Sequence, residues 1–118
     1  MPEYGRTLVL LMLCTSSATC MAQQGNVEEG RRLLAARGCA ACHRIPGVAP
    51  GRAAAGPPLD HIGRQSYLAG KLPNNAANMA RWIMHPRRIS PGSAMPELGI
   101  TAQEAGDMTA YLYQQGDH

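Results

Sequence analysis

The segment CAACH at residues 39–43 places two cysteines three positions apart, with a histidine directly after the second. The three reactive side chains are Cys39, Cys42 and His43. Thiolates and imidazoles are metal ligands, and paired thiols also take part in redox and covalent chemistry. The pattern is therefore compatible with a zinc site, a redox-active disulfide or the covalent attachment of a cofactor. The rest of the sequence decides between these possibilities.

Two of the three possibilities lack the sequence features that they need. A structural zinc site has four ligands, but there is no second CxxC, and His61, His85 and His118 do not form an H-x₃₋₅-H pair. A thioredoxin-like disulfide lies in a βαβ unit, and no such unit is visible. The pattern CxxCH is typical of c-type haem attachment. On a short helical turn, two such thiols can reach the two vinyl groups of one haem, and His43 is placed beside the iron as an axial ligand.

Residues 1–22 have the organisation of a secretory signal peptide. A short start with one arginine is followed by a short apolar run and then by small and polar residues. The apolar run is far below the length of about 20 residues that spans a bilayer. We expect cleavage after Ala22, which leaves residues 23–118 as one domain. Anchoring by an uncleaved signal or a lipid at Cys20 is the alternative, although Ser17 stands where lipid signals have an aliphatic residue.

The composition provides few large apolar side chains for a core. The 118 residues include no Phe, one Trp and four Tyr, together with 13 Gly and 9 Pro. Because a chain of about 100 residues is only marginally stable by itself, we expect a bound group to fill the centre. The formal net charge of +3 is too small for a nucleic-acid-binding protein.

The sequence predicts three helices and no sheet. Each helix begins at a residue that favours an N-cap and ends at glycine or proline. No stretch shows the apolar–polar alternation of a strand. The loops at 46–58 and 90–99 are rich in Gly and Pro, and long loops in a small domain often bind a ligand. The helices are expected from Asn26 to Gly38, from Asn75 to Pro86 and from Thr101 to Gly116.

Met95 is the candidate for a second axial ligand. Haem iron held by His and Met is an electron-transfer arrangement. Met79 and Met108 lie on apolar faces of predicted helices, where methionine usually fills the core, and Met84 lies at a helix end. Met95 instead lies in the proline-rich turn SPGSAMPEL, which would fix the direction of its thioether. Histidine alternatives for this position are His61 and His85.

Taken together, these motifs resemble the class I c-type cytochromes, the monohaem family with an N-terminal CxxCH and a C-terminal Met ligand. The resemblance implies a small all-α cytochrome c fold, with roughly three to five helices wrapped around one covalently attached haem c. Leucines follow Gly30 where the family often has an aromatic residue, which affects packing detail. The resemblance covers residues 26–115 and rests on CAACH, GPPL at 56–59, ARWIMHP at 80–86, SPGSAMPELG at 90–99 and MTAYLY at 108–113.

The resemblance also implies roles for individual residues. Cys39 and Cys42 would form the haem thioethers, and His43 and Met95 would be the iron ligands. The carbonyl of Pro57 would accept a hydrogen bond from Nδ1–H of His43 and fix its tautomer. Further candidates for the haem pocket are Trp82 against the haem on the Met side, Ser93 at the haem edge or a propionate, and Arg64 near the propionates.

The resemblance implies electron transfer and not enzymatic catalysis, because protein ligands at both axial positions leave no open site for a substrate. We expect a monomeric periplasmic carrier of a respiratory chain. Its partners would be redox proteins such as an oxidase, reductase, peroxidase or dehydrogenase, with neither nucleic acid nor a small-molecule substrate. A weak basic rim of Arg44, Arg87 and Arg88 would attract an acidic partner.

Two alternatives to a free carrier stay open at this point. The first is an electron-transfer subunit docked tightly to an exported dehydrogenase or oxidase. The second is a haem enzyme or sensor in which Met95 leaves the iron and admits a small ligand. No residue in the sequence is marked as a distal acid or base for that chemistry.

Overall fold

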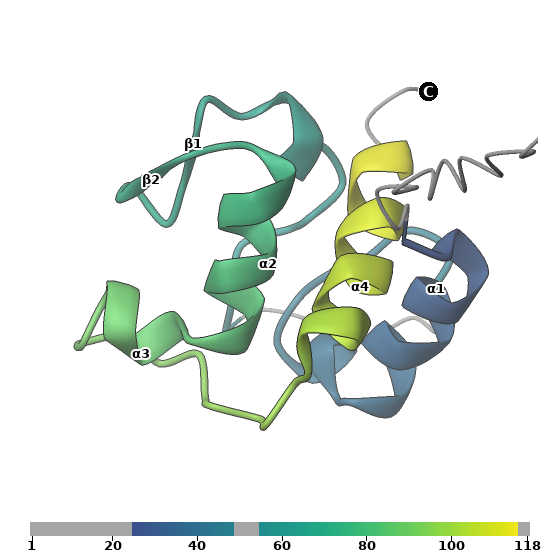
Figure 1. Cartoon of the computed structure of the whole chain (residues 1–118), viewed down its shortest axis with the longest axis horizontal. Helices are drawn as coiled ribbons and strands as arrows, with labels where there is room; N and C mark the ends of the chain where they lie inside the picture. Colours follow the sequence, from purple (N-terminus) through teal and green to yellow (C-terminus); the bar gives the residue numbers. More distant parts are fainter. Residues whose placement is uncertain (1–24, 49–54, 116–118) are drawn as a thin grey trace, which may run out of the picture.

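The computed structural model describes residues 25–48 and 55–115, and the predicted signal peptide at 1–22 lies outside them. The described residues form four α-helices, two short 3₁₀ turns and one two-stranded hairpin (Figure 1). The three predicted helices are confirmed, and a short fourth helix, α3, was not predicted. The helices are α1 (Val27–Ala36), α2 (Ala76–Met84), α3 (Pro86–Ile89) and α4 (Ala102–Gln114).

Helices α1 and α4 cross in close contact and bring the two ends of the domain together (Figure 1). A glycine makes the crossing possible: a Cβ atom at Gly30 would lie 2.0 Å from the backbone oxygen of Asp107. Any larger side chain there would force the helices apart. The hydroxyl of Tyr111, which lies on α4, donates a hydrogen bond to the carbonyl of Pro46.

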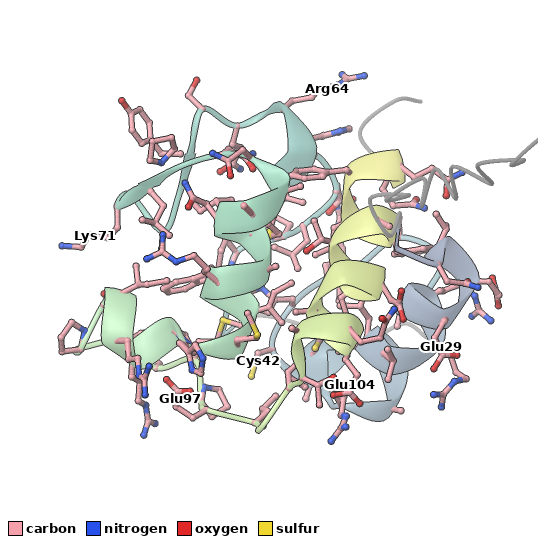
Figure 2. All side chains as sticks on the ribbon, in the orientation of Figure 1. Glu29, Cys42, Arg64, Lys71, Glu97 and Glu104 are labelled. Carbon is pink, nitrogen blue, oxygen red and sulfur yellow. The ribbon has the colours of Figure 1, made fainter. Side chains whose placement is uncertain are left out.

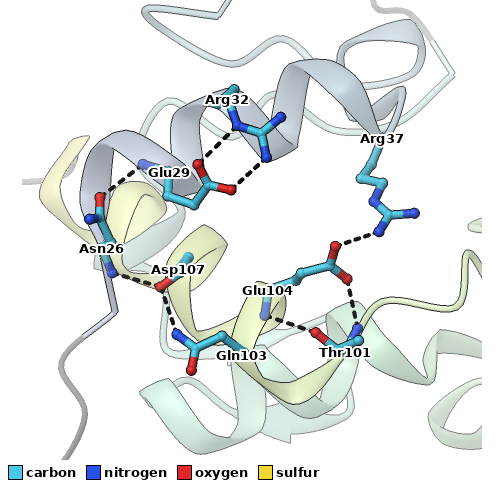
Figure 3. Close-up of polar contacts among 8 residues, drawn as sticks. All are labelled: Asn26, Glu29, Arg32, Arg37, Thr101, Gln103, Glu104 and Asp107. Carbon is cyan, nitrogen blue, oxygen red and sulfur yellow. Dashed lines mark hydrogen bonds and ion pairs between the residues drawn. The ribbon is translucent and has the colours of Figure 1, made fainter.

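Side-chain caps fix where the long helices begin. The side chain of Asn26 accepts a hydrogen bond from the amide of Glu29, and Thr101 and Glu104 form a capping box at the start of α4. The carboxylate of Asp107, only 5% exposed, accepts a hydrogen bond of 2.7 Å from the backbone nitrogen of Asn26 (Figure 3). The N-terminus of α1 is thereby bonded directly to α4.

A small hairpin is the one departure from the predicted absence of a sheet. Strand β1 (Tyr67–Leu68) pairs antiparallel with β2 (Leu72–Pro73). Ala69 and Gly70 in the turn both have positive φ, at 51° and 65°. Strands of two residues are too short to show alternation, so the sequence pattern could not indicate them.

The buried side chains come from all three long helices and from the loops between them. Helix α2 packs on the side of α4 away from α1, so that α4 lies between the other two (Figure 1). None of the helices in 25–48 or 55–115 is long and apolar enough to cross a membrane. The buried apolar residues are Leu33, Leu34, Ile45, Val48, Leu68, Met79, Ile83, Ile100, Ala105, Met108, Tyr111 and Leu112.

Candidate functional site

The CAACH segment follows directly from the end of α1. Gly38 has φ +78°, a left-handed conformation that glycine adopts without strain and that commonly ends helices. The chain then forms a 3₁₀ turn at Cys39–Ala41, and the amide of His43 donates to the carbonyl of Cys39 at 2.9 Å. The predicted short helical turn is therefore present.

A cavity of about 540 Å³ lies between this turn, α2, α4, the hairpin and the loop before α4. Its walls are mainly apolar, and Cys42 is labelled in Figure 2 in the region between α2 and α4. The volume falls within the roughly 300–1,000 Å³ typical of cofactor and ligand pockets. The predicted site residues that line it are Cys39, Cys42, His43, Pro57, Trp82, Ser93 and Met95.

The imidazole of His43 is held from one side by the chain segment at 56–59. Its Nδ1 lies 2.7 Å from the carbonyl oxygen of Pro57. Because a carbonyl only accepts, Nδ1 carries the proton, and Nε2 is left with a free lone pair. Backbone hydrogen bonds from Gly56 to Cys42 (2.8 Å) and from Leu59 to Arg44 (2.9 Å) hold the two segments together.

Gly56 leaves only enough room for this ring. A Cβ atom there would lie 2.5 Å from Cε1 and 2.7 Å from Nδ1 of His43. The ring is therefore confined between the Gly56 backbone and the cavity, with Nδ1 already bonded.

The two thiols of the CAACH segment are free and differ in exposure. Cys39 is half-buried and Cys42 is exposed, and they are not joined in a disulfide. Burial raises the pKa of the Cys39 thiol above its ordinary value, so this group stays protonated at neutral pH. Across the described part of the chain, no three His, Cys, Asp or Glu side chains group as metal ligands.

Met95 lines the same cavity from a loop without regular structure. Its side chain is half-buried, and its backbone nitrogen donates to Oγ of Ser93 at 3.1 Å. Met79 and Met108 also line the cavity, but they are 2% and 0% exposed within α2 and α4. Met84 does not line it. Among the four methionines weighed from the sequence, Met95 is the one that comes from a loop and lines the cavity.

Arg64 does not belong to the cavity wall. It ends the 3₁₀ turn at Ile62–Arg64, and its side chain points outward in Figure 2. Its neighbours Ile62 and Gln65 line the cavity instead. The role of Arg64 in screening a propionate therefore stays a prediction. Polar lining residues that sequence reasoning missed are Arg37, Gln65 and Ser90. Arg37 lies two residues before CAACH and Ser90 begins the SPGSAMPELG motif, whereas Gln65 lies outside the recognised motifs.

These residues fit a covalently attached haem. Two free thiols, an imidazole with Nδ1 already bonded and a thioether face one apolar cavity. Such a donor set offers two attachment points and one nitrogen and one sulfur ligand for iron. The carbonyl of Pro57 would orient the imidazole and increase its donor strength.

Comparison with known proteins also points to a protein that binds haem c. The sequence profile described as cytochrome c matches residues 27–115. A curated relative is cytochrome c oxidase subunit 2 of Alkalihalophilus pseudofirmus, which is 32% identical over 85 residues. The match covers 72% of this chain but only 23% of that relative, so the chain spans less than a quarter of its length.

Solved structures share the fold. SoxXA from P. pantotrophus has a TM-score of 0.62 at 24% identity, covering 81% of this chain and 85% of that one. Cytochrome c2 from Rhodobacter sphaeroides has a TM-score of 0.58 at 17% identity, with 76% and 95% covered. Cytochrome cH from Methylobacterium extorquens also has a TM-score of 0.58, at 24% identity, with 76% and 99% covered.

The all-α cytochrome c fold expected from the sequence is thereby confirmed. The profile match extends from α1 to the end of α4 and includes the whole CAACH segment. This chain therefore belongs to the cytochrome c family, whose members bind haem c covalently and are typically electron-transfer proteins rather than enzymes.

Proposed function

We propose that this protein is a periplasmic electron carrier of a respiratory chain, with its haem held by Cys39 and Cys42 and its iron ligated by His43 and Met95. The observation that carries the proposal is the convergence of these four side chains on one apolar cavity. The haem supplies the iron that cycles between Fe(II) and Fe(III). The chain supplies covalent retention, two axial ligands and walls that exclude water.

The polypeptide favours electron transfer over ligand activation. Pro57 fixes the His43 ring at 2.7 Å, and Met95 would occupy the other axial position. An iron with both positions filled has no open site for O₂ or peroxide. The largely apolar cavity keeps the solvent response to a change of iron charge small, which favours fast transfer.

Two observations support an exported respiratory protein. The N-terminal residues 1–22 have a signal-peptide pattern, and cytochrome c oxidase subunit 2 is a relative at 32% identity. The natural partner would then be a membrane-bound oxidase or reductase. We infer that the protein works as a monomer that meets this partner by diffusion.

The same relative favours one alternative. A domain of this kind occurs within a longer oxidase subunit, since the match covers only 23% of that relative. The present chain is therefore also suited to permanent docking on an exported oxidase or dehydrogenase. Purification without detergent, followed by gel filtration, separates the two: a carrier elutes alone, and a docked subunit elutes with its complex.

A basic surface for the partner lies beside the Met95 loop, which comprises residues 90–99. Arg87 and Arg88 lie on α3 and are exposed, and no ion pair of either guanidinium is found in the described part of the chain. Arg44 differs from the expectation, because its guanidinium is paired with Asp60 at 2.7 Å. We therefore place the basic rim on Arg87 and Arg88 and leave Arg44 out of it.

The test is the oxidation of the reduced protein by membranes of the source organism. We expect rapid, cyanide-sensitive oxidation that slows several-fold between about 0.01 and 0.15 M ionic strength, where the screening length falls from about 30 to 8 Å. The double variant R87Q/R88Q should be slower at low salt and less salt-dependent. Oxidation no faster than in buffer would contradict the respiratory role. Rates independent of salt would contradict the basic rim alone.

A further inference from the structure

Glu97 lies two residues after Met95 and contacts the start of α3 through both carboxylate oxygens. Oε1 accepts a hydrogen bond of 3.2 Å from the backbone nitrogen of Arg87, and Oε2 lies 3.5 Å from Nδ1 of His85. The backbone N–H groups in the first turn of a helix have no partner within that helix. Figure 2 shows Glu97 below α3 in the view. The carboxylate therefore joins the segment after Met95 to a helix.

The segment before Met95 is fixed in a different way. The backbone nitrogen of Met95 donates to Oγ of Ser93, and the amide of Ser93 donates to the carbonyl of Ser90 at 2.9 Å. Within the described ranges, no backbone–backbone hydrogen bond connects residues 94–100 to another segment. The polar contacts that hold this stretch in place are therefore Ser93 on one side of Met95 and Glu97 on the other.

We propose that Glu97 is a positioning residue for Met95, which acts by fixing the Met95 loop to α3. The proposal rests on the proposed function in one respect, that Met95 is the iron ligand. A ligand carried by a loop is in equilibrium with a minor state in which the loop is open and the iron position is accessible. Contacts made only in the closed state lower the population of the open one. Loss of the Glu97 contacts would therefore make the iron easier for an external ligand to reach.

The size of the effect follows from the kind of contact. His85 and Glu97 have exposed side chains, at 44% and 39%, so their ion pair alone is weak. The bond to the Arg87 amide resembles a helix N-cap, and removing such a cap typically changes an equilibrium on the order of fivefold. Because an external ligand binds only the open state, its apparent affinity rises by the same factor as the open fraction.

Glu104 offers a matched control for Glu97. It also accepts a backbone N–H, from Thr101 at 2.9 Å, and it also pairs with a cationic side chain, that of Arg37. Its contacts stabilise the start of α4, after the end of the Met95 loop at residue 99. Glu104 does not line the cavity, and its partner Arg37 lines it from the end of α1 and not from the Met95 loop. A general loss of stability should therefore follow either substitution, whereas exposure of the iron should follow only the loss of Glu97.

The experiment is a titration of the ferric holoprotein with imidazole, followed by the far-red iron–thioether band. We expect Glu97→Ala to lower the imidazole dissociation constant about three- to tenfold. Glu97→Gln should lie closer to the wild type, because its amide oxygen can still accept the bond from Arg87. Glu104→Ala should lower the urea midpoint and leave the imidazole dissociation constant within about twofold of the wild type.

An unchanged dissociation constant in Glu97→Ala would overturn the role of Glu97, as would an equal decrease in Glu104→Ala. Either result, obtained with a wild type that has the far-red band and loses it on adding imidazole, rejects this inference alone. A wild type without that band, or a Met95→Leu variant that keeps it, rejects Met95 as the ligand and with it both proposals.

Discussion

At the scale of single residues, the chemistry of the site depends on how little freedom His43 has. Its Nδ1 lies 2.7 Å from the carbonyl oxygen of Pro57, and the Gly56 backbone lies against the ring. The first contact sets the tautomer, and the second sets the position of the imidazole. A ring that lines the cavity and is held through Nδ1 is what ligation through the other ring nitrogen requires.

Gly56→Ala tests this confinement. The added Cβ would meet Cε1 at 2.5 Å, so the ring must move and the bond to Pro57 must weaken. We expect urea unfolding of the holoprotein to show a loss of about 1–3 kcal/mol, as for an overpacked core. A weaker hydrogen bond from Nδ1–H of His43 to the Pro57 carbonyl should also raise the reduction potential.

The control for this variant is Gly92→Ala. A Cβ at Gly92 would have no neighbour within 4 Å, and the φ of Gly92 is not positive. It should keep the wild-type urea midpoint and potential. If Gly56→Ala behaves in the same way as Gly92→Ala, the confinement of His43 has no energetic importance.

The sequence predicts the roles of some site residues better than those of others. CxxCH is a local motif, and its chemistry follows from spacing within one turn, so Cys39, Cys42 and His43 could be identified directly. The role of Arg64 near the propionates stays a prediction, because lining the cavity depends on tertiary contacts that a loop sequence does not specify. Gln65, its neighbour, lines the cavity instead.

At the scale of elements, the contact between α1 and α4 determines the shape of the domain. The two helices meet at Gly30. They are also joined at one end by Asp107, whose carboxylate accepts a hydrogen bond from the backbone amide of Asn26 (Figure 3). The same carboxylate accepts a bond from the side chain of Gln103 at 3.3 Å. No buried side-chain polar atom of the described residues lacks a partner, so this buried acid is accommodated at little cost.

Gly30→Ala should destabilise the protein by about 2–3 kcal/mol, because a Cβ at 2.0 Å from the oxygen of Asp107 requires the helices to separate. Gly106→Ala is the matched substitution on the other helix, where a Cβ has no neighbour within 4 Å. It should stabilise by up to about 1 kcal/mol through helix propensity alone. Urea denaturation of both variants measures the difference. Equal effects of the two substitutions would show that the crossing is not tight.

The ends of the helices were predictable because caps are local signals. Asn26, Asn75 and Thr101 each accept a backbone N–H as expected. Helix α3 and the hairpin were missed because each is too short to have a period. The sequence predicts that a helix stops before Pro86, and Pro86 is also the first residue of α3, where its fixed φ and missing N–H are favourable.

At the scale of the whole molecule, the cavity explains the unusual composition. A chain with no Phe and one Trp surrounds about 540 Å³ with side chains from α2, α4, the hairpin and the Met95 loop. A haem in that volume would supply the apolar contacts that aromatic side chains supply elsewhere. The shortage of large side chains predicts a bound group, and the folded arrangement supplies a cavity that such a group would fill.

Three methionines line the cavity, and this gives the most direct test of the central claim that Met95 is the iron ligand opposite His43. The measurement is the optical spectrum of the ferric holoprotein in the far red, for the wild type and for Met95→Leu, Met79→Leu and Met108→Leu. We predict that the wild type and the variants at Met79 and Met108 show the iron–thioether band and that Met95→Leu alone lacks it. A band that survives in Met95→Leu, or that is absent from the wild type, would contradict the account.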